Sequence, residues 1–69
     1  MILVYSHGQR TGPTVATINR QHPAADTYRA AEPWLLLHAT GRVDRFASLA
    51  EARAEALKSW PGVSFRRGA

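Results

Sequence analysis

The residues best suited to metal chemistry are three histidines, and their spacing argues against a metal site. His7, His22 and His38 are far apart in the chain, and none has a cysteine or a Glu-x-x-His partner nearby. A zinc site needs three or four convergent ligands. His38 directly follows three leucines, which is typical of a histidine at the edge of a hydrophobic core. We therefore expect no metal site and no cofactor.

Nucleophiles and paired carboxylates are present, but their placement does not favour catalysis. Ser6 precedes His7 directly, and adjacent residues rarely converge as a nucleophile and its base. Glu51 and Glu55 lie one turn apart on a predicted helix, on the face expected to meet solvent rather than a cleft. The loop from Gly8 to Gly12 lacks the Lys-Ser/Thr ending of a phosphate-binding loop. We therefore expect a protein that is not an enzyme.

Arginine is the remaining residue type with distinctive chemistry. The net charge is +4, and eight of the nine basic residues are arginines. Such an excess steers a protein toward nucleic acid or an acidic partner, although a GC-rich genome also produces an arginine-rich and alanine-rich composition. If four of the candidate arginines lie on neighbouring strands, they form a basic rim able to follow phosphates. The alternative is that the arginines are dispersed and solvating. The candidate binding residues are Arg10 and the four rim members Arg42, Arg45, Arg66 and Arg67.

Length and composition indicate one small domain over residues 1–69. Hydrophobic residues make up 45% of the chain, which is enough for a modest core. There is no cysteine, so disulfides are excluded and a reducing compartment is permitted. No run approaches the roughly 20 apolar residues that cross a membrane, and residues 1–5 lack the basic start of a signal peptide. We expect a cytoplasmic protein that does not enter the membrane.

The first half of the chain predicts two strands and one segment of undecided structure. Ile2 to Tyr5 is almost wholly apolar, which is typical of an internal strand. Thr14 to Ile18 is rich in β-branched residues and favours a strand, although helical spacing from Pro13 to His22 is an alternative. Ala24 to Glu32 is compatible with a second short helix or with an edge strand at Thr27 to Arg29, and both alternatives stay open.

The second half predicts a strand, a tight return, an edge strand, a helix and a final edge strand. Pro33 disfavours helix at the residue before it, so a strand begins at Trp34. In that strand, Leu35 and Leu37 point one way and Leu36 points the other way. Its apolar residues on both faces predict a central position with both faces covered. The predicted ranges are Trp34 to His38, Arg42 to Phe46, Ser48 to Trp60 for the helix, and Val63 to Arg66.

The predicted helix supplies much of the predicted core. Ser48 is an N-cap, and Glu51 completes a capping box three residues later. Arg53 falls inside the apolar arc, so it either runs along the core edge to water or pairs with a carboxylate such as Asp44. The expected core contains Leu35 and Leu37 or their neighbours on the other face, together with Phe46, Leu49, Ala56, Leu57 and Trp60.

These elements predict an α+β fold, with an antiparallel sheet of about three to five strands and a C-terminal amphipathic helix on one face. For function, we expect a small non-catalytic protein that docks on a larger host protein or protein–nucleic-acid complex and inhibits or modulates it, as anti-CRISPR proteins do. That expectation comes from small size and lack of motifs, which are typical of phage and mobile-element proteins. The alternative is direct DNA or RNA binding by the basic rim. We expect a monomer, or a weak homodimer through the final edge strand.

Overall fold

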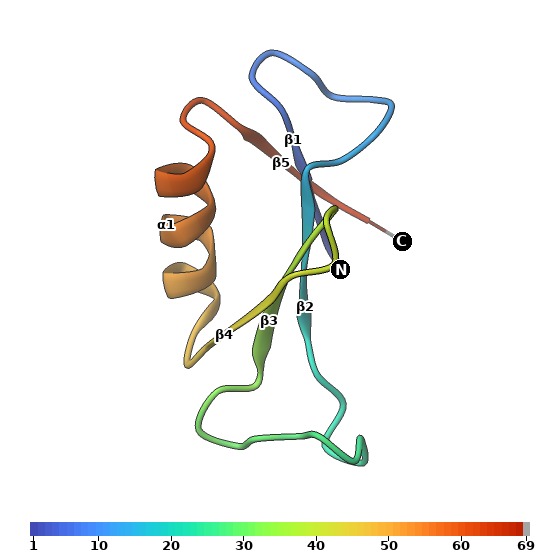
Figure 1. Cartoon of the computed structure of the whole chain (residues 1–69), viewed down its shortest axis with the longest axis vertical. Coiled ribbons are helices and arrows are strands. Elements are labelled where there is room, and N and C mark those ends of the chain that lie inside the picture. Colours follow the sequence, from blue (N-terminus) through green and yellow to red (C-terminus); the bar gives the residue numbers. More distant parts are fainter. Residues whose placement is uncertain (69) are drawn as a thin grey trace.

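The computed structural model describes residues 1–68, and in this range it contains a five-stranded antiparallel sheet with one helix packed against it (Figure 1). The predicted α+β fold is therefore confirmed. The strand order is β4-β3-β2-β1-β5. The elements are β1 (Ile2–Tyr5), β2 (Ala16–Arg20), β3 (Trp34–His38), β4 (Val43–Phe46), α1 (Leu49–Ser59) and β5 (Ser64–Arg67).

The chain forms a meander that the helix then carries back to the opposite edge. Strands β1 to β4 pair each with the next, and β5 pairs antiparallel with β1. The internal position predicted for β1 and the edge positions predicted for β4 and β5 are confirmed. Because α1 connects the two edge strands, residues close in sequence on either side of the helix lie far apart across the sheet.

Two predictions in the first half need correction. Strand β2 begins at Ala16 rather than Thr14 and continues to Arg20, because Asn19 and Arg20 pair with Leu35 and Trp34 of β3. Residues 21–33 form a series of turns, with neither the helix nor the edge strand that the sequence left open. Each turn is closed by a hydrogen bond that a backbone amide donates to the carbonyl three residues earlier. The Ala25 amide, for example, donates to the His22 carbonyl at 3.0 Å. A short segment without an apolar face to bury does not repay the cost of helix nucleation.

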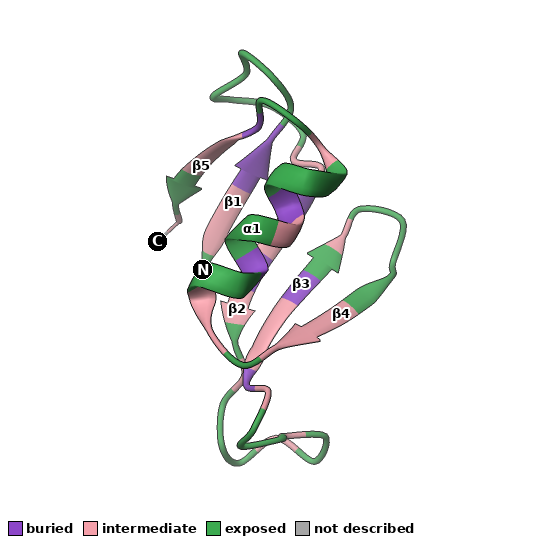
Figure 2. Cartoon of the chain, turned by 90° about the vertical axis from the view of Figure 1, so that its left-hand side faces the viewer, coloured by how far each residue is buried: buried purple, intermediate pink, exposed green. Residues whose placement is uncertain are grey.

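The core lies between the helix and one face of the sheet (Figure 2). Directly paired residues share a face, so the register places Ile2, Ile18 and Leu36 in one row beneath the helix. The prediction that Leu36 faces one side of the sheet and Leu35 and Leu37 the other is confirmed. Of the two alternatives for the core, the correct one has Leu36 facing the helix. The opposite face is not covered as predicted, since Leu37 is 43% exposed there. The buried core consists of Val4, Ala16, Ile18, Leu36, Ala52, Ala56 and Val63.

The helix begins and ends as its sequence predicts. The hydroxyl of Ser48 accepts a hydrogen bond from the Glu51 amide at 3.2 Å, and the Glu51 carboxylate accepts one from the Ala47 amide at 3.1 Å. Ala52 and Ala56 are fully buried, so these small side chains let the helix approach the sheet closely. Leu57 is 46% exposed and does not belong to the core as predicted. It follows Ala56 by 100° around the helix and so turns away from the sheet.

The loop between β1 and β2 is attached to the turn between α1 and β5. His7 Nδ1 lies 3.1 Å from the carbonyl oxygen of Gly62, and a Cβ atom at Gly62 would overlap the imidazole. Farther along, the Ser64 hydroxyl donates to the carbonyl of Gln9 at 2.5 Å. The polar loop that follows Tyr5 is therefore held at His7 and at Gln9, and it places Arg10 next to β5.

Candidate functional site

A hollow of about 560 Å³ opens between the helix and one side of the sheet. The helix contacts β2, β3 and β4 most closely, so the helix-facing side of β5 and the start of β1 are left partly uncovered. The floor is apolar, with Ile2, Ile18 and Leu49 in the lining. This volume lies within the range of small-ligand sites in proteins, about 300–1,000 Å³.

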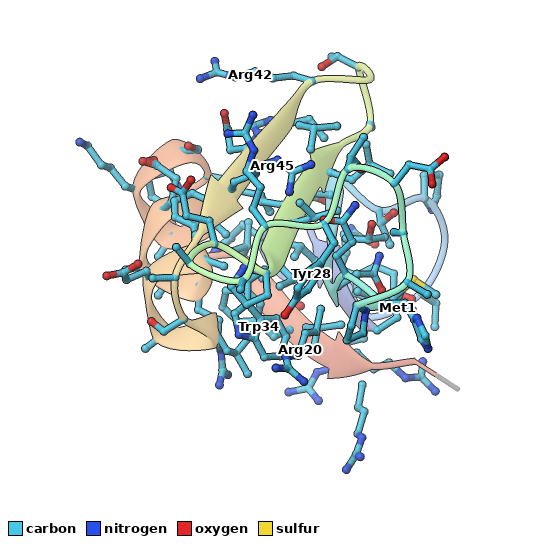
Figure 3. All side chains as sticks on the ribbon, turned by 90° about the horizontal axis from the view of Figure 1, so that it is seen from below. Met1, Arg20, Tyr28, Trp34, Arg42 and Arg45 are labelled. Carbon is cyan, nitrogen blue, oxygen red and sulfur yellow. The ribbon has the colours of Figure 1, made fainter. Side chains whose placement is uncertain are left out.

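Four arginines line this hollow, and three different elements supply them. Arg20 is the last residue of β2, Arg53 lies in the middle of α1, and Arg66 and Arg67 are in β5. The register places Arg67 on the helix side of the sheet and Arg66 on the opposite face, so Arg66 only borders the hollow at the β5 edge. All four are exposed. The β2–β3 register places Arg20 directly opposite Trp34, and Figure 3, which is seen from below, shows the two side by side. We call this site the arginine hollow.

Two half-buried aromatic residues complete the arginine hollow. Trp34 lies in β3 and Phe65 in β5, which are separated by β2 and β1 in the sheet. The guanidinium carbon of Arg53 lies 4.9 Å from the centroid of the Phe65 ring, within the range of a cation–π contact. Arg53 thus follows the first of its two predicted courses, because it runs along Phe65 at the edge of the core and is exposed to water, and it does not pair with Asp44.

The electrostatics of the arginine hollow are one-sided. Among residues 1–68, its lining contains no carboxylate, and none of its four arginines forms an ion pair. The described carboxylates are in the turns of residues 21–33, on β4 and on the helix. Clefts lined by charge of one sign, with apolar walls, concentrate the field and attract counter-ions. The arginine hollow is therefore suited to an anion that also has an apolar part.

The predicted rim of four arginines does not form. Arg42 and Arg45 lie at the β4 edge, whereas Arg66 and Arg67 lie at the β5 edge. The two edges are about 19 Å apart, because neighbouring strands lie about 4.8 Å apart. Figure 3 shows Arg42 standing well away from Arg20. The condition for the rim, that these strands are neighbours, is not met, because α1 carries the chain from β4 to the opposite edge of the sheet.

The other predicted arginines have different surroundings. Arg45 donates a hydrogen bond from Nη1 to the side-chain oxygen of Gln21 at 2.9 Å, which ties β4 to the start of the turns. The carbonyl of Arg10 accepts a bond from Arg66 Nη1 at 3.2 Å. The structure therefore brings Arg10, Arg66 and Arg67 to one side of the molecule and leaves Arg42 and Arg45 on the other side.

Sequence reasoning missed Arg20 and Arg53 as site residues. A signal for each was present. Arg20 follows Ile18 by two positions in a strand, so it shares the face of a buried residue. Arg53 falls within the apolar arc of the helix. An arginine on the core-facing side of a helix or strand extends along the edge of the core to reach water. Two such arginines on elements that pack together therefore indicate a basic rim around an apolar floor.

A second cluster of charged groups lies at the other end of the sheet. His38 Nε2 lies 2.8 Å from Asp44 Oδ2, and Arg42 Nε donates to Asp44 Oδ1 at 3.3 Å. The imidazole also lies 5.0 Å from the Trp60 ring, centroid to centroid. The hydrogen bond from His38 and the positive charge of Arg42 lower the pKa of Asp44. We call these residues the Asp44 cluster, and every charged group in it has a partner.

Comparison with protein-family models, curated proteins and solved structures finds no match. The geometry of the chain is therefore the basis for its proposed function. Within residues 1–68, no three histidine or acidic side chains gather as a metal site would require. None of the helices described is long and apolar enough to cross a membrane. The arginine hollow is the described feature with the most specific chemistry, since it combines a concave shape, unpaired positive charge and aromatic rings.

Proposed function

We propose that this protein is a non-catalytic nucleic-acid-binding protein and that the arginine hollow is its binding site. The observation that carries the proposal is the convergence of Arg20, Arg53 and Arg67 from three elements around Trp34 and Phe65, with no carboxylate in the described lining. Phosphates supply most of the affinity of nucleic acid for proteins through such basic residues. Aromatic side chains add stacking with bases, which tolerates any sequence.

The test is the salt dependence of binding to labelled oligonucleotides, measured by fluorescence anisotropy. Contact with about three phosphates predicts a slope of about −2 for the logarithm of affinity against the logarithm of salt concentration on a single strand. The site variant is the double substitution Arg20→Gln with Arg67→Gln. The matched control is Arg29→Gln with Lys58→Gln, which removes the same charge from residues outside the lining.

We expect the site variant to lose most of its affinity and to show a slope nearer zero by about 1.4, as about 0.7 is lost for each phosphate contact. The control should bind nearly as the parent does. Equal losses in both variants would show that net charge alone attracts the nucleic acid. Absence of binding even at about 50 mM salt, where phosphate contacts are strong, would refute the proposal.

A second candidate function is docking on a larger protein, and it is supported by the face of the sheet opposite the helix. There Leu37 and Val43 are paired in register and are 43% and 48% exposed. Arg45 and Arg66 share that face by the same alternation. In this proposal an acidic partner with an apolar patch covers the face. The partner is a larger host protein or protein–nucleic-acid complex in the cytoplasm, which the chain inhibits as an anti-CRISPR protein of a phage would.

The two candidate functions use different surfaces, so they can be separated. The protein, as a monomer or a weak homodimer, is used to capture partners from a host lysate. A docking partner should be retained by the Arg20→Gln, Arg67→Gln variant and lost when Leu37 and Val43 are replaced by serine and threonine. A captured protein that is insensitive to Leu37 and Val43 would refute docking through this face.

A further inference from the structure

We infer that the arginine hollow admits unpaired bases, so that the protein binds single-stranded nucleic acid in preference to duplex. This inference rests on the proposed function and concerns the substrate class of the same site. It depends on a difference in depth, because the aromatic rings of the hollow are less exposed than its arginines. The four arginines are exposed, whereas Trp34 and Phe65 are half-buried inside the hollow.

This difference in depth separates the two forms of nucleic acid. In a duplex the bases are paired and stacked on one another, so the outer surface offers phosphates to the arginines and nothing to the recessed rings. In a single strand the bases can turn outward and stack on aromatic side chains or on arginine planes. A single strand thus gains contacts with both groups in the arginine hollow, and a duplex gains contacts with one.

The arginine hollow provides two separate places for a base. One is Trp34 on β3, opposite Arg20. The other is at Phe65 on β5, opposite Val4 of β1, where the guanidinium group of Arg53 lies over the ring. At Phe65 the base therefore stacks on the guanidinium plane of Arg53, because such planes pack against bases as rings do. Two strands lie between the two places, so they do not enclose one base together, and Arg20 and Arg67 are placed to meet the phosphates of neighbouring nucleotides.

The carboxylate-free lining also favours a strand over a neutral apolar ligand. In a nucleic-acid strand every base is attached to a phosphate. Each stacked base therefore adds one contact with a ring and one contact with an arginine. The arginine hollow supplies both kinds of group, with two aromatic rings and the side chains of Arg20, Arg53 and Arg67 on the helix side of the sheet. A purely apolar ligand would leave these arginines without partners.

The test compares an oligothymidine of about twelve nucleotides, which covers typical site sizes, with a duplex of equal length at the same salt concentration. We expect the parent to bind the single strand about tenfold or more tighter than the duplex. The substitution Trp34→Leu should weaken single-strand binding by about 5- to 100-fold, the usual effect of losing one stacked base. Duplex binding should change little, because the arginines remain.

A fluorescence measurement keeps the test independent of the stability of that variant. Trp60→Phe keeps an aromatic ring beside His38 and leaves Trp34 as the sole tryptophan of the chain. The single strand should quench the emission of Trp34, and a duplex at equal occupancy should leave it nearly unchanged. Thymidine monophosphate is the third probe, and we expect it to bind far more weakly than the strand because it supplies one phosphate.

Three results would overturn the inference. They are duplex binding equal to or tighter than single-strand binding, equal quenching of Trp34 by both, and monophosphate binding as tight as that of the strand. In each of these cases the salt-sensitive binding that supports the proposed function would still be present. If no probe bound with salt sensitivity, the proposed function itself would fail, and the two failures are therefore distinguishable.

Discussion

The arginine hollow and the Asp44 cluster each contain arginine and a tryptophan, yet they differ in how the charge is balanced. In the Asp44 cluster one carboxylate meets both His38 and Arg42, and Trp60 packs against the imidazole. In the arginine hollow Arg20, Arg53 and Arg67 gather around Trp34 and Phe65, with no carboxylate in the described lining. The first arrangement is complete without a ligand. The second leaves arginine side chains available to an anion.

The comparison indicates what each tryptophan does. Trp60 ends the helix, with its amide bonded to the carbonyl of Ala56 at 2.9 Å, and it packs on the end of β3. Trp34 lies in the wall of an open site. Therefore Trp60 should contribute mainly to folding, and Trp34 should contribute more to binding.

The substitution Trp60→Ala should lower the free energy of unfolding by about 3 kcal/mol, at the lower end of the range for large aromatic residues because the side chain is half-exposed. Trp34→Leu should cost less than about 1.5 kcal/mol, since it keeps a large apolar side chain. Urea denaturation followed by circular dichroism measures both. A Trp60→Ala protein that unfolds at the urea concentration of the parent would contradict the role assigned to Trp60.

Saturation with the oligothymidine should stabilise the folded protein, since a ligand that binds only the native state raises its free energy of unfolding. At a concentration one hundred times the Kd, the gain should be about 2.7 kcal/mol. Thermal melting with and without the strand measures this gain. It should vanish in the Arg20→Gln, Arg67→Gln variant and persist when Arg42 is replaced by glutamine. Equal stabilisation of both variants would place the ligand elsewhere.

Acidification should remove the stabilising contribution of the Asp44 cluster. The hydrogen bond from His38, helped by Arg42, lowers the pKa of Asp44 from 3.8, so the folded state favours the ionised carboxylate. This contribution is present at pH values above 3.8 and is lost as the pH falls below it through the folded-state pKa. Urea denaturation between neutral pH and about pH 2.5 checks this, with Asp44→Asn as the control. An Asp44→Asn protein with the same acid-dependent loss as the parent would contradict it.

Single arginine substitutions should have the smallest effects, and the two regions should differ in direction. Arg42→Gln removes an exposed ion pair and should lower the free energy of unfolding by less than about 1 kcal/mol. Arg67→Gln relieves repulsion among like charges and should leave stability unchanged or slightly raised, within about 0.5 kcal/mol. Careful denaturation curves at low salt measure both changes. A larger loss of unfolding free energy from Arg67→Gln than from Arg42→Gln would contradict the difference in charge balance between the two regions.

The sequence predicts local features well where one segment decides them. The strand Trp34–His38 begins after Pro33 as expected, and the helix starts with the predicted bond between Ser48 and Glu51. Each of these depends on residues within a few positions of one another. The same holds for the apolar strand Ile2–Tyr5, whose internal position follows from its composition.

The candidate site could not be predicted in the same way, because it depends on contacts between distant segments. Arg20 and Trp34 are brought together by the register of two strands, and Arg53 meets Phe65 only because the helix crosses the sheet. The strand order also separates Arg42 and Arg45 from Arg66 and Arg67, so these four arginines do not form one rim. The turns of residues 21–33 were equally undetermined, since no periodic apolar pattern fixes their structure.

NMR titration maps where the oligothymidine touches the protein, from the shifts of backbone amides and arginine Nε–H groups. If the arginine hollow is the binding site, the largest shifts will occur at Arg20, Arg53 and Arg67 and at the indole of Trp34. Small shifts are expected around Asp44. Shifts concentrated at Arg42 and Arg45 on the β4 edge, with the arginine hollow unchanged, would contradict this assignment.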